Sequence, residues 1–169
     1  MEQRVKTLLT SLYSGKISKE QFIESYFENK NSNNEFVLEF MAKGMVDKSD
    51  ETIEEVIVLL STGFFPISVF VSNLRILLLE SWHTRHEDVV TLLTGFSDDS
   101  TIEHLYKATE LKLSYLDYDD TYQLARKCIK SLSRIGNDLS LNKIRCLMNS
   151  GNDVIAGYAR KELVHKGLL

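Results

Sequence analysis

The sequence contains one proline, Pro66, and only eight glycines in 169 residues. A chain with many tight β-turns would carry more of both, because proline and glycine fit the backbone angles that such turns require. Long helices tolerate their scarcity. The composition therefore favours a helical protein over a β-rich one.

Long apolar runs are also missing. The longest stretches, residues 55–60 and 76–79, are far shorter than the roughly 20 residues needed to cross a bilayer. The first residues, MEQRVKTLL, mix acid and base before a short apolar run and do not resemble a signal peptide. We therefore expect a soluble, cytoplasmic protein without a membrane partner.

The chain has little cysteine and no excess of positive charge. Cys128 and Cys146 both lie in segments with helical period, where we expect them to be reduced, small core residues. Lysine and arginine number 20 and aspartate and glutamate 24, for a formal net charge of −4. This balance argues against a general nucleic-acid binder and suits a partner that is itself basic.

What the sequence does contain is apolar residues at i, i+3, i+4 and i+7 in nearly every segment, which predicts about ten helices and no strand. Ser18 and Gln21 form a capping box, the polar run 29–34 is expected to be a loop, and Pro66 fits the first turn of a helix. That helix is apolar nearly all round, so we expect it to be covered on both sides. The expected helices are 5–13, 19–27, 36–45, 50–62, 66–82, 86–95, 99–111, 119–135, 140–148 and 153–166.

A weak repeat runs through the second half of the chain. Ala125-Arg126-Lys127 recurs 34 residues later as Ala159-Arg160-Lys161, and residues 148–163 align with 96–111. In the second alignment, Val154 matches Ile102 and Tyr158 matches Tyr106. Such helix pairs cannot bury their apolar faces alone, so we expect them to stack on one another.

The stretch 125–163 resembles a pair of HEAT-type helical repeats. The segment LLESWHTRHEDVV, followed by YLDYDD and the ARK helix, resembles small bacterial HEAT-like proteins. Some of these are immunity proteins encoded beside polymorphic or contact-dependent growth inhibition toxins. The resemblance covers about residues 66–165. It implies a right-handed α-α superhelix for these residues, whereas the first 60 residues resemble no family. With the helical period of the whole chain, we expect one all-α domain, 1–169, with N-terminal helices in 1–64 and HEAT-like repeats in 65–169.

The stretch LESWHTRHEDVV places His83 and His86 three residues apart, with Glu87 following. A zinc site needs three or four converging ligands, and H-x-x-H-E is not the H-E-x-x-H order of helix-borne metalloproteases. A positive group at the end of one helix and acids in the first turn of the next are typical of a corner between two helices. We expect a corner that shapes the chain or contacts a partner, with no metal and no cofactor.

Residues 115–122 contain three acids and three tyrosines in eight positions. Tyrosines provide large contact area at low entropic cost, and acids complement a basic target. In the alternative interpretation, Asp119 or Asp120 caps the following helix and one or two tyrosines lie in the core. The expected partner-binding residues are Asp117, Tyr118, Asp119, Asp120 and Tyr122, with Trp82, His83, His86 and Glu87 from the neighbouring corner.

No arrangement of residues indicates catalysis. The sequence has no G-x-S-x-G elbow and no glycine-rich phosphate loop, and Cys128 has no histidine beside it. We therefore expect no enzymatic activity. The first hypothesis is an immunity protein, monomeric when free, whose acidic surface occludes the basic cleft of a cognate toxin, a nuclease in the most concrete form. The others are a general HEAT-like adaptor, and a HEAT-like DNA glycosylase, which would need a basic groove.

Overall fold

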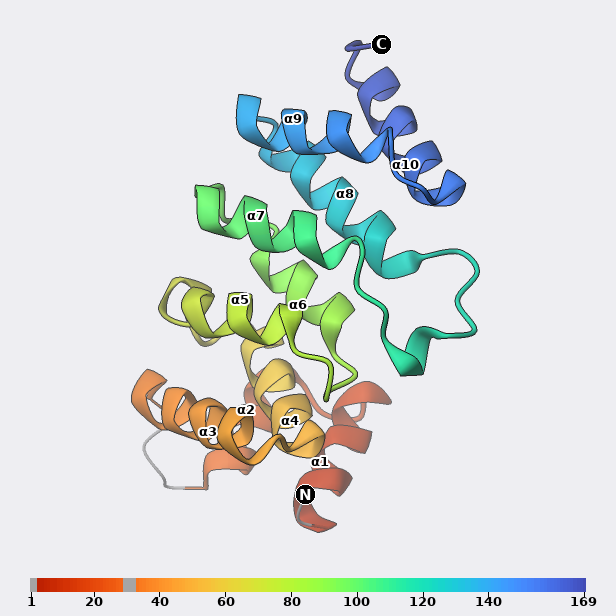
Figure 1. The fold of residues 1–169 in the computed structure, drawn as a ribbon. Coiled ribbons are helices and arrows are strands. Elements are labelled where there is room, and N and C mark those ends of the chain that lie inside the picture. Colours follow the sequence, from red (N-terminus) through yellow and green to blue (C-terminus); the bar gives the residue numbers. More distant parts are fainter. Residues whose placement is uncertain (1–2, 29–32) are drawn as a thin grey trace. The chain divides into compact units, whose positions relative to one another are not determined.

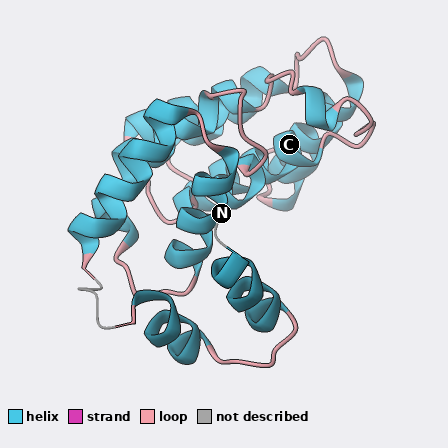
Figure 2. Ribbon diagram, turned by 90° about the horizontal axis from the view of Figure 1, so that it is seen from below, coloured by secondary structure: helices cyan, strands magenta, loops and turns pink. Residues whose placement is uncertain are grey.

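The computed structural model describes residues 3–28 and 33–169, and in these ranges the chain forms only helices, turns and loops (Figure 2). The expected all-α fold with about ten helices is confirmed; the handedness of the superhelix stays a prediction. The described α-helices are α1 (Gln3–Tyr13), α2 (Lys19–Phe27), α3 (Asn34–Asp47), α4 (Asp50–Ser61), α5 (Val71–Leu79), α6 (His86–Leu93), α7 (Asp99–Ala108), α8 (Gln123–Ile135), α9 (Asp138–Leu147) and α10 (Asp153–His165), with 3₁₀ helices η1 (Ile67–Val69) and η2 (Ser114–Leu116).

The chain divides into two compact units, Met1–Phe70 and Val71–Leu169. In the first unit, α1 packs on α2 and α3 packs on α4. The predicted capping box at Ser18 is present, with its hydroxyl accepting from the Gln21 amide and the Gln21 side chain accepting from the Ser18 amide. Of the expected loop 29–34, residues 29–32 lie outside the described residues, Asn33 caps α3, and Asn34 is already helical.

Helix α4 is the most completely buried helix of the first unit. Every side chain from Glu55 to Leu60 is buried, and Tyr26 donates a hydrogen bond to the Glu55 carboxylate at 3.0 Å. Helix α3 approaches α4 closely at Gly44, where an added Cβ would lie 2.7 Å from Cγ2 of Thr52. The side chain of any other residue would push the two helices apart.

The second unit is a stack of helices in two layers (Figure 1). Helices α5, α7 and α9 contact in that order in one layer, and α6, α8 and α10 in the other. Between the layers, α5 packs on α6, α7 on α8, and α9 on both α8 and α10, so each layer covers the apolar face of the other. Fully buried side chains between the layers include Leu74, Leu78, Val89, Leu93, Ile102, Leu105, Ile129, Leu132, Ile144 and Leu163.

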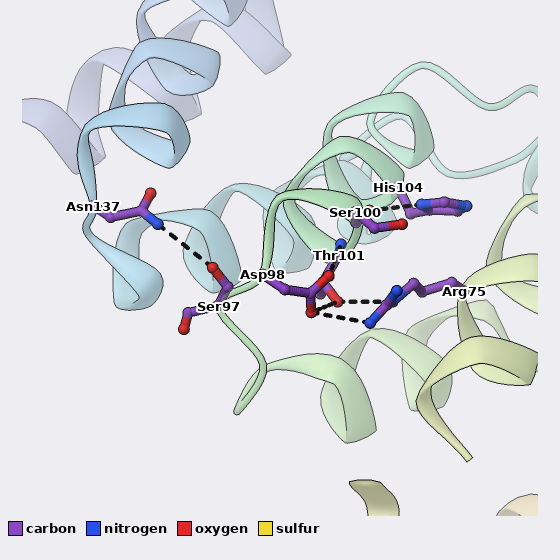
Figure 3. Close-up of polar contacts among 7 residues, drawn as sticks. All are labelled: Arg75, Ser97, Asp98, Ser100, Thr101, His104 and Asn137. Atoms are coloured by element: carbon purple, nitrogen blue, oxygen red, sulfur yellow. Dashed lines mark hydrogen bonds and ion pairs between the residues drawn. The ribbon is translucent and has the colours of Figure 1, made fainter. Parts of the chain in front are cut away.

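Polar contacts join successive helices within the α5–α7–α9 layer (Figure 3). The Arg75 guanidinium donates to the Asp98 carboxylate and to the Thr101 hydroxyl, each at 3.0 Å, and Asp98 also accepts from the Thr101 amide that begins α7. Burial alone would raise the pKa of Asp98, but the Thr101 hydrogen bonds and the Arg75 charge together lower it. Asp98 therefore caps α7 and ties it to α5.

Several sequence-based expectations about helix ends are wrong. The helix expected from Pro66 to Trp82 is shorter, because residues 67–69 form η1 and α5 runs only from Val71 to Leu79. It is not covered on both sides, since the Ile76 side chain is 53% exposed. The helix expected to reach Leu111 ends at Ala108, and the helix expected from Asp119 begins at Gln123.

Two further expectations are also wrong. The alignment of residues 148–163 with 96–111 equates α10 with α7, which belong to different layers. Accordingly, Ile102 is fully buried, whereas its match Val154 is 38% exposed. Cys128 is a core residue as expected, but Cys146 is exposed because it lies on the outer face of α9.

Candidate functional site

The connection between α7 and α8, residues 109–122, leaves the helix stack and passes beside the corner between α5 and α6 (Figure 1). Tyr115 in η2 joins the two segments. Its hydroxyl lies 2.9 Å from Nδ1 of His86, and the two rings stack with centroids 5.6 Å apart. The structure thus brings together the two sequence segments that were expected to form one surface.

The corner itself is built on two stacked histidines. The rings of His83 and His86 lie parallel with centroids 4.0 Å apart. Nε2 of His83 donates to the Leu77 carbonyl at 2.8 Å, and Nδ1 accepts from the amide of Arg85 at 3.0 Å. Nε2 of His86 donates to the Glu80 carbonyl at 2.7 Å, which leaves Nδ1 as the acceptor for Tyr115. Both imidazoles therefore satisfy backbone groups at the end of α5.

This geometry changes the role of four of the expected interface residues. His83 and His86 are 1% and 0% exposed, so the expectation that their side chains contact a partner is wrong. Trp82 is half-buried and donates from Nε1 to the Glu80 carboxylate at 2.9 Å. Glu87 forms an ion pair with Lys127 of α8 at 2.8 Å, so its charge is already balanced. These residues shape and support the neighbouring surface.

The turn before α8 is held by its own hydrogen bonds. The Asp119 carboxylate accepts from the Thr121 amide at 3.0 Å and from the Gln123 amide at 2.6 Å, the second of which begins α8. Asp119 therefore satisfies the first amide of α8, although Tyr122 and not Asp119 occupies the N-cap position that the alternative interpretation assigned to an acid. The Tyr158 hydroxyl of α10 donates to the Thr121 carbonyl at 2.7 Å. Tyr122 has a φ of 50°, a left-handed conformation that is uncommon for a bulky residue. These contacts fix one conformation of the turn.

Four of the expected interface residues point outward from this turn. Asp117, Tyr118, Asp120 and Tyr122 are all exposed, and Tyr118, at 95%, is the most exposed of the large hydrophobic side chains in the described part of the chain. An exposed tyrosine on a rigid support is typical of an interface anchor. We call residues 117–122 the acidic turn.

The acidic turn forms one wall of a groove of about 570 Å³. The opposite wall comes from the turn between α9 and α10, with Ser150 and Asn152. Apolar side chains line its floor, and its carboxylates outnumber its one cation, Lys112. The carboxylates are Glu110, Asp117, Asp119 and Asp120, and the apolar residues include Leu111, Leu113, Leu116, Leu124 and Ile155. Such a groove suits a basic segment that also carries an apolar side chain.

Sequence reasoning missed Glu110, Lys112 and Tyr115 as parts of this site. The apolar period of α7 continues through Leu111, which hides the end of the helix. The signal that was available is Thr109, whose hydroxyl donates to the Tyr106 carbonyl at 2.7 Å and closes the last turn. Threonine hydrogen-bonds nearby backbone groups in this way where helices end.

The acidic turn gives a prediction for acid conditions. The Thr121 hydroxyl, and then the amides of Thr121 and Gln123, hold the pKa of Asp119 below its ordinary value. Because the folded pKa is the lower one, Asp119 stabilises the fold above the unfolded pKa of about 3.9, and this contribution is lost as the pH falls through the folded value.

We expect Asp119→Ala to lower the unfolding free energy by about 1 kcal/mol at pH 7, as for loss of a helix cap. The measurement is the difference in Tm between the two proteins, followed by circular dichroism from pH 7 to acid. The difference should begin to shrink at about pH 4, where the unfolded carboxyl becomes protonated, and should reach its minimum once the folded carboxyl is protonated as well. A constant difference at all pH values would contradict a charge-dependent cap.

The residues that the structure describes give little indication of metal binding, thiol chemistry or membrane insertion. Within residues 3–28 and 33–169, no group of three or more histidine, cysteine or acidic side chains is arranged to hold a metal ion. Burial raises the pKa of the Cys128 thiol, which keeps it protonated and unreactive. Over the same ranges, no helix is both long and apolar enough to cross a bilayer.

The comparisons with known proteins identify no family for this chain, so its fold class and its acidic groove are the features that characterise it. The sequence matches no protein-family model and no curated protein, and the structure matches no solved structure. The class that the fold defines is an all-α protein whose second unit stacks helices in two layers.

Proposed function

We propose that this chain is a protein-binding immunity protein that neutralises a cognate bacterial toxin by occluding the toxin's basic active-site cleft. The observation that carries the proposal is the groove beside the acidic turn, where four carboxylates surround an apolar floor. Because phosphate-binding clefts of nucleases are basic, the carboxylates would stand in for substrate phosphates.

Rigidity of the acidic turn adds to the proposal. Asp119 and the Tyr158 hydroxyl hold the backbone of the turn from inside, while Asp117, Tyr118 and Asp120 stay exposed. A turn that is ordered before binding loses little conformational entropy when the partner docks. Opposite charges across the interface would also speed association, which an inhibitor of a toxin requires.

The test is coexpression of this chain with the C-terminal domain of the protein encoded immediately upstream of its gene, which we expect to be toxic. We expect growth to be restored and a complex of the two proteins to elute together in size-exclusion chromatography. The complex should form faster at low salt than at high salt, because exposed charges are screened. A neighbouring domain that is not toxic, or one that kills the cells equally well in the presence of this chain, would contradict the proposal.

A further inference from the structure

A second groove, of about 410 Å³, lies between α8 and α10 and shares no lining residue with the acidic one. Its charge has the opposite sign. Only one carboxylate, Glu162, lines this groove. The cations that line it are Arg126, Lys130 and Arg134 from α8 and Lys161 and Lys166 from α10, and His165 of α10 lies beside them. We call it the basic groove.

The two helices present these cations to each other along their length. At one end, the Arg126 guanidinium lies 5.6 Å from the centroid of the Tyr158 ring. At the other end, Nζ of Lys166 would lie 3.5 Å from a Cβ placed on Gly136, which follows α8. The helices therefore run in the same direction. The face from Arg126 to Arg134 is about 12 Å long, because a helix rises about 1.5 Å per residue.

Helix stability does not account for this arrangement. Arg126, Lys130 and Arg134 follow each other at i, i+4 and i+8, and like charges four apart destabilise a helix. Arg134 and Lys166 lie near the negative end of α8, which favours them, but Lys130 and Lys161 lie in the middle of their helices. In the described part of the chain, no carboxylate lies within 4.0 Å of the charged groups of Lys130 or Lys161.

The residues that line the basic groove favour a phosphodiester strand over an acidic helix as the anionic partner. An acidic amphipathic helix would need an apolar floor, but besides the Tyr158 ring only Ile129 contributes a large apolar side chain. A phosphodiester strand needs cations spaced along a narrow track and gains from an aromatic ring on which a base can stack. Two arginines add donors that match phosphate geometry.

We propose that the basic groove binds the phosphodiester backbone of a single-stranded nucleic acid without regard to its sequence. The formal net charge of −4 led us to expect no nucleic-acid partner, but a sum over the chain does not report a local groove of one sign. The basic groove shares no lining residue with the acidic groove, although Tyr158 also donates to Thr121 of the acidic turn. The variants that test the proposal leave Tyr158 unchanged, so the result does not depend on the immunity function.

The test is fluorescence anisotropy with a labelled oligothymidine and a labelled oligouridine of about 12 nucleotides, titrated with the full chain over a range of salt. We expect binding at low salt that weakens as salt rises, with a log–log slope of about −2 to −3 for three or four phosphate contacts. Lys130→Glu/Lys161→Glu should bind at least about tenfold more weakly, with a shallower slope.

The matched control is Arg145→Glu/Arg160→Glu, two exposed arginines on α9 and α10 that do not line the groove. It makes the same charge change and should weaken binding much less than the groove variant, because neither arginine lines the groove. The groove variant should melt no lower than wild type, because the carboxylate introduced at position 130 would lie four residues from both Arg126 and Arg134. Weaker binding by this variant would therefore not result from unfolding. Equal losses in both variants, no binding at low salt, or displacement of the oligonucleotide by polyglutamate at equal charge would each overturn the proposal.

Discussion

Replacing Asp117 and Asp120 together with lysine is expected to abolish protection and to weaken binding of the toxin domain by at least about 100-fold, or roughly 2.7 kcal/mol. Both side chains are exposed, line the groove and make no side-chain hydrogen bond within the described part of the chain. The substitution therefore turns attraction into repulsion against a basic partner without removing an internal contact. The measurements are cell survival during coexpression and the Kd from calorimetry.

The choice of residues follows from the structure. Asp119 looks equivalent to its neighbours in the sequence, but its carboxylate accepts from the amides of Thr121 and Gln123, so its replacement by lysine would disturb the turn as well as its charge. A matched control is Asp138→Lys/Asp153→Lys, which changes the net charge equally at exposed positions outside the groove. We expect this control to protect like wild type, and both variants to keep the helical circular dichroism. Full protection by the groove variant would exclude the acidic turn as the contact.

Structural features that depend on local periodicity were predicted correctly from the sequence, whereas features that depend on tertiary contacts were not. The helices follow from apolar spacing, and the capping box at Ser18 follows from two residues three apart. The ends of α7 and α8 were misplaced because the apolar period runs on into the loop that the acidic turn needs. Whether a histidine points outward or inward depends on partners far away in the chain, such as Tyr115 for His86.

The net charge of the protein could be predicted from the sequence, but the full distribution of that charge over the surface could not. Counting acids and bases indicated a mildly acidic protein, and the crowding of acids in residues 117–120 was visible in the sequence. The cations of α8 and α10 are spread through segments that also contain many apolar residues, and only the side-by-side packing of the two helices gathers them. The sequence therefore pointed to one surface, and the structure contains two grooves of opposite charge.

The second large effect is expected at the corner. We expect His86→Ala to lower the unfolding free energy of the second unit by about 3 kcal/mol and its Tm by at least about 5 °C. The side chain is fully buried, so its removal leaves a cavity, and it also takes away the partners of the Glu80 carbonyl and the Tyr115 hydroxyl. Tyr115→Phe removes only one hydroxyl and should cost about 1 kcal/mol.

Trp82 is the only tryptophan of the chain and lies edge-on to His83, with ring centroids 5.3 Å apart, so its fluorescence reports on the corner directly. In His86→Ala its emission should shift to the red below the melting temperature of the helices, because the corner opens first. The control is His104→Ala on α7, whose ring hydrogen-bonds the Ser100 carbonyl of its own helix and which should change Tm little (Figure 3). Because Tyr115 of η2 packs on His86, His86→Ala should also weaken toxin binding, although the His86 side chain is buried. A variant that melts and binds like wild type would show that the corner does not position the acidic turn.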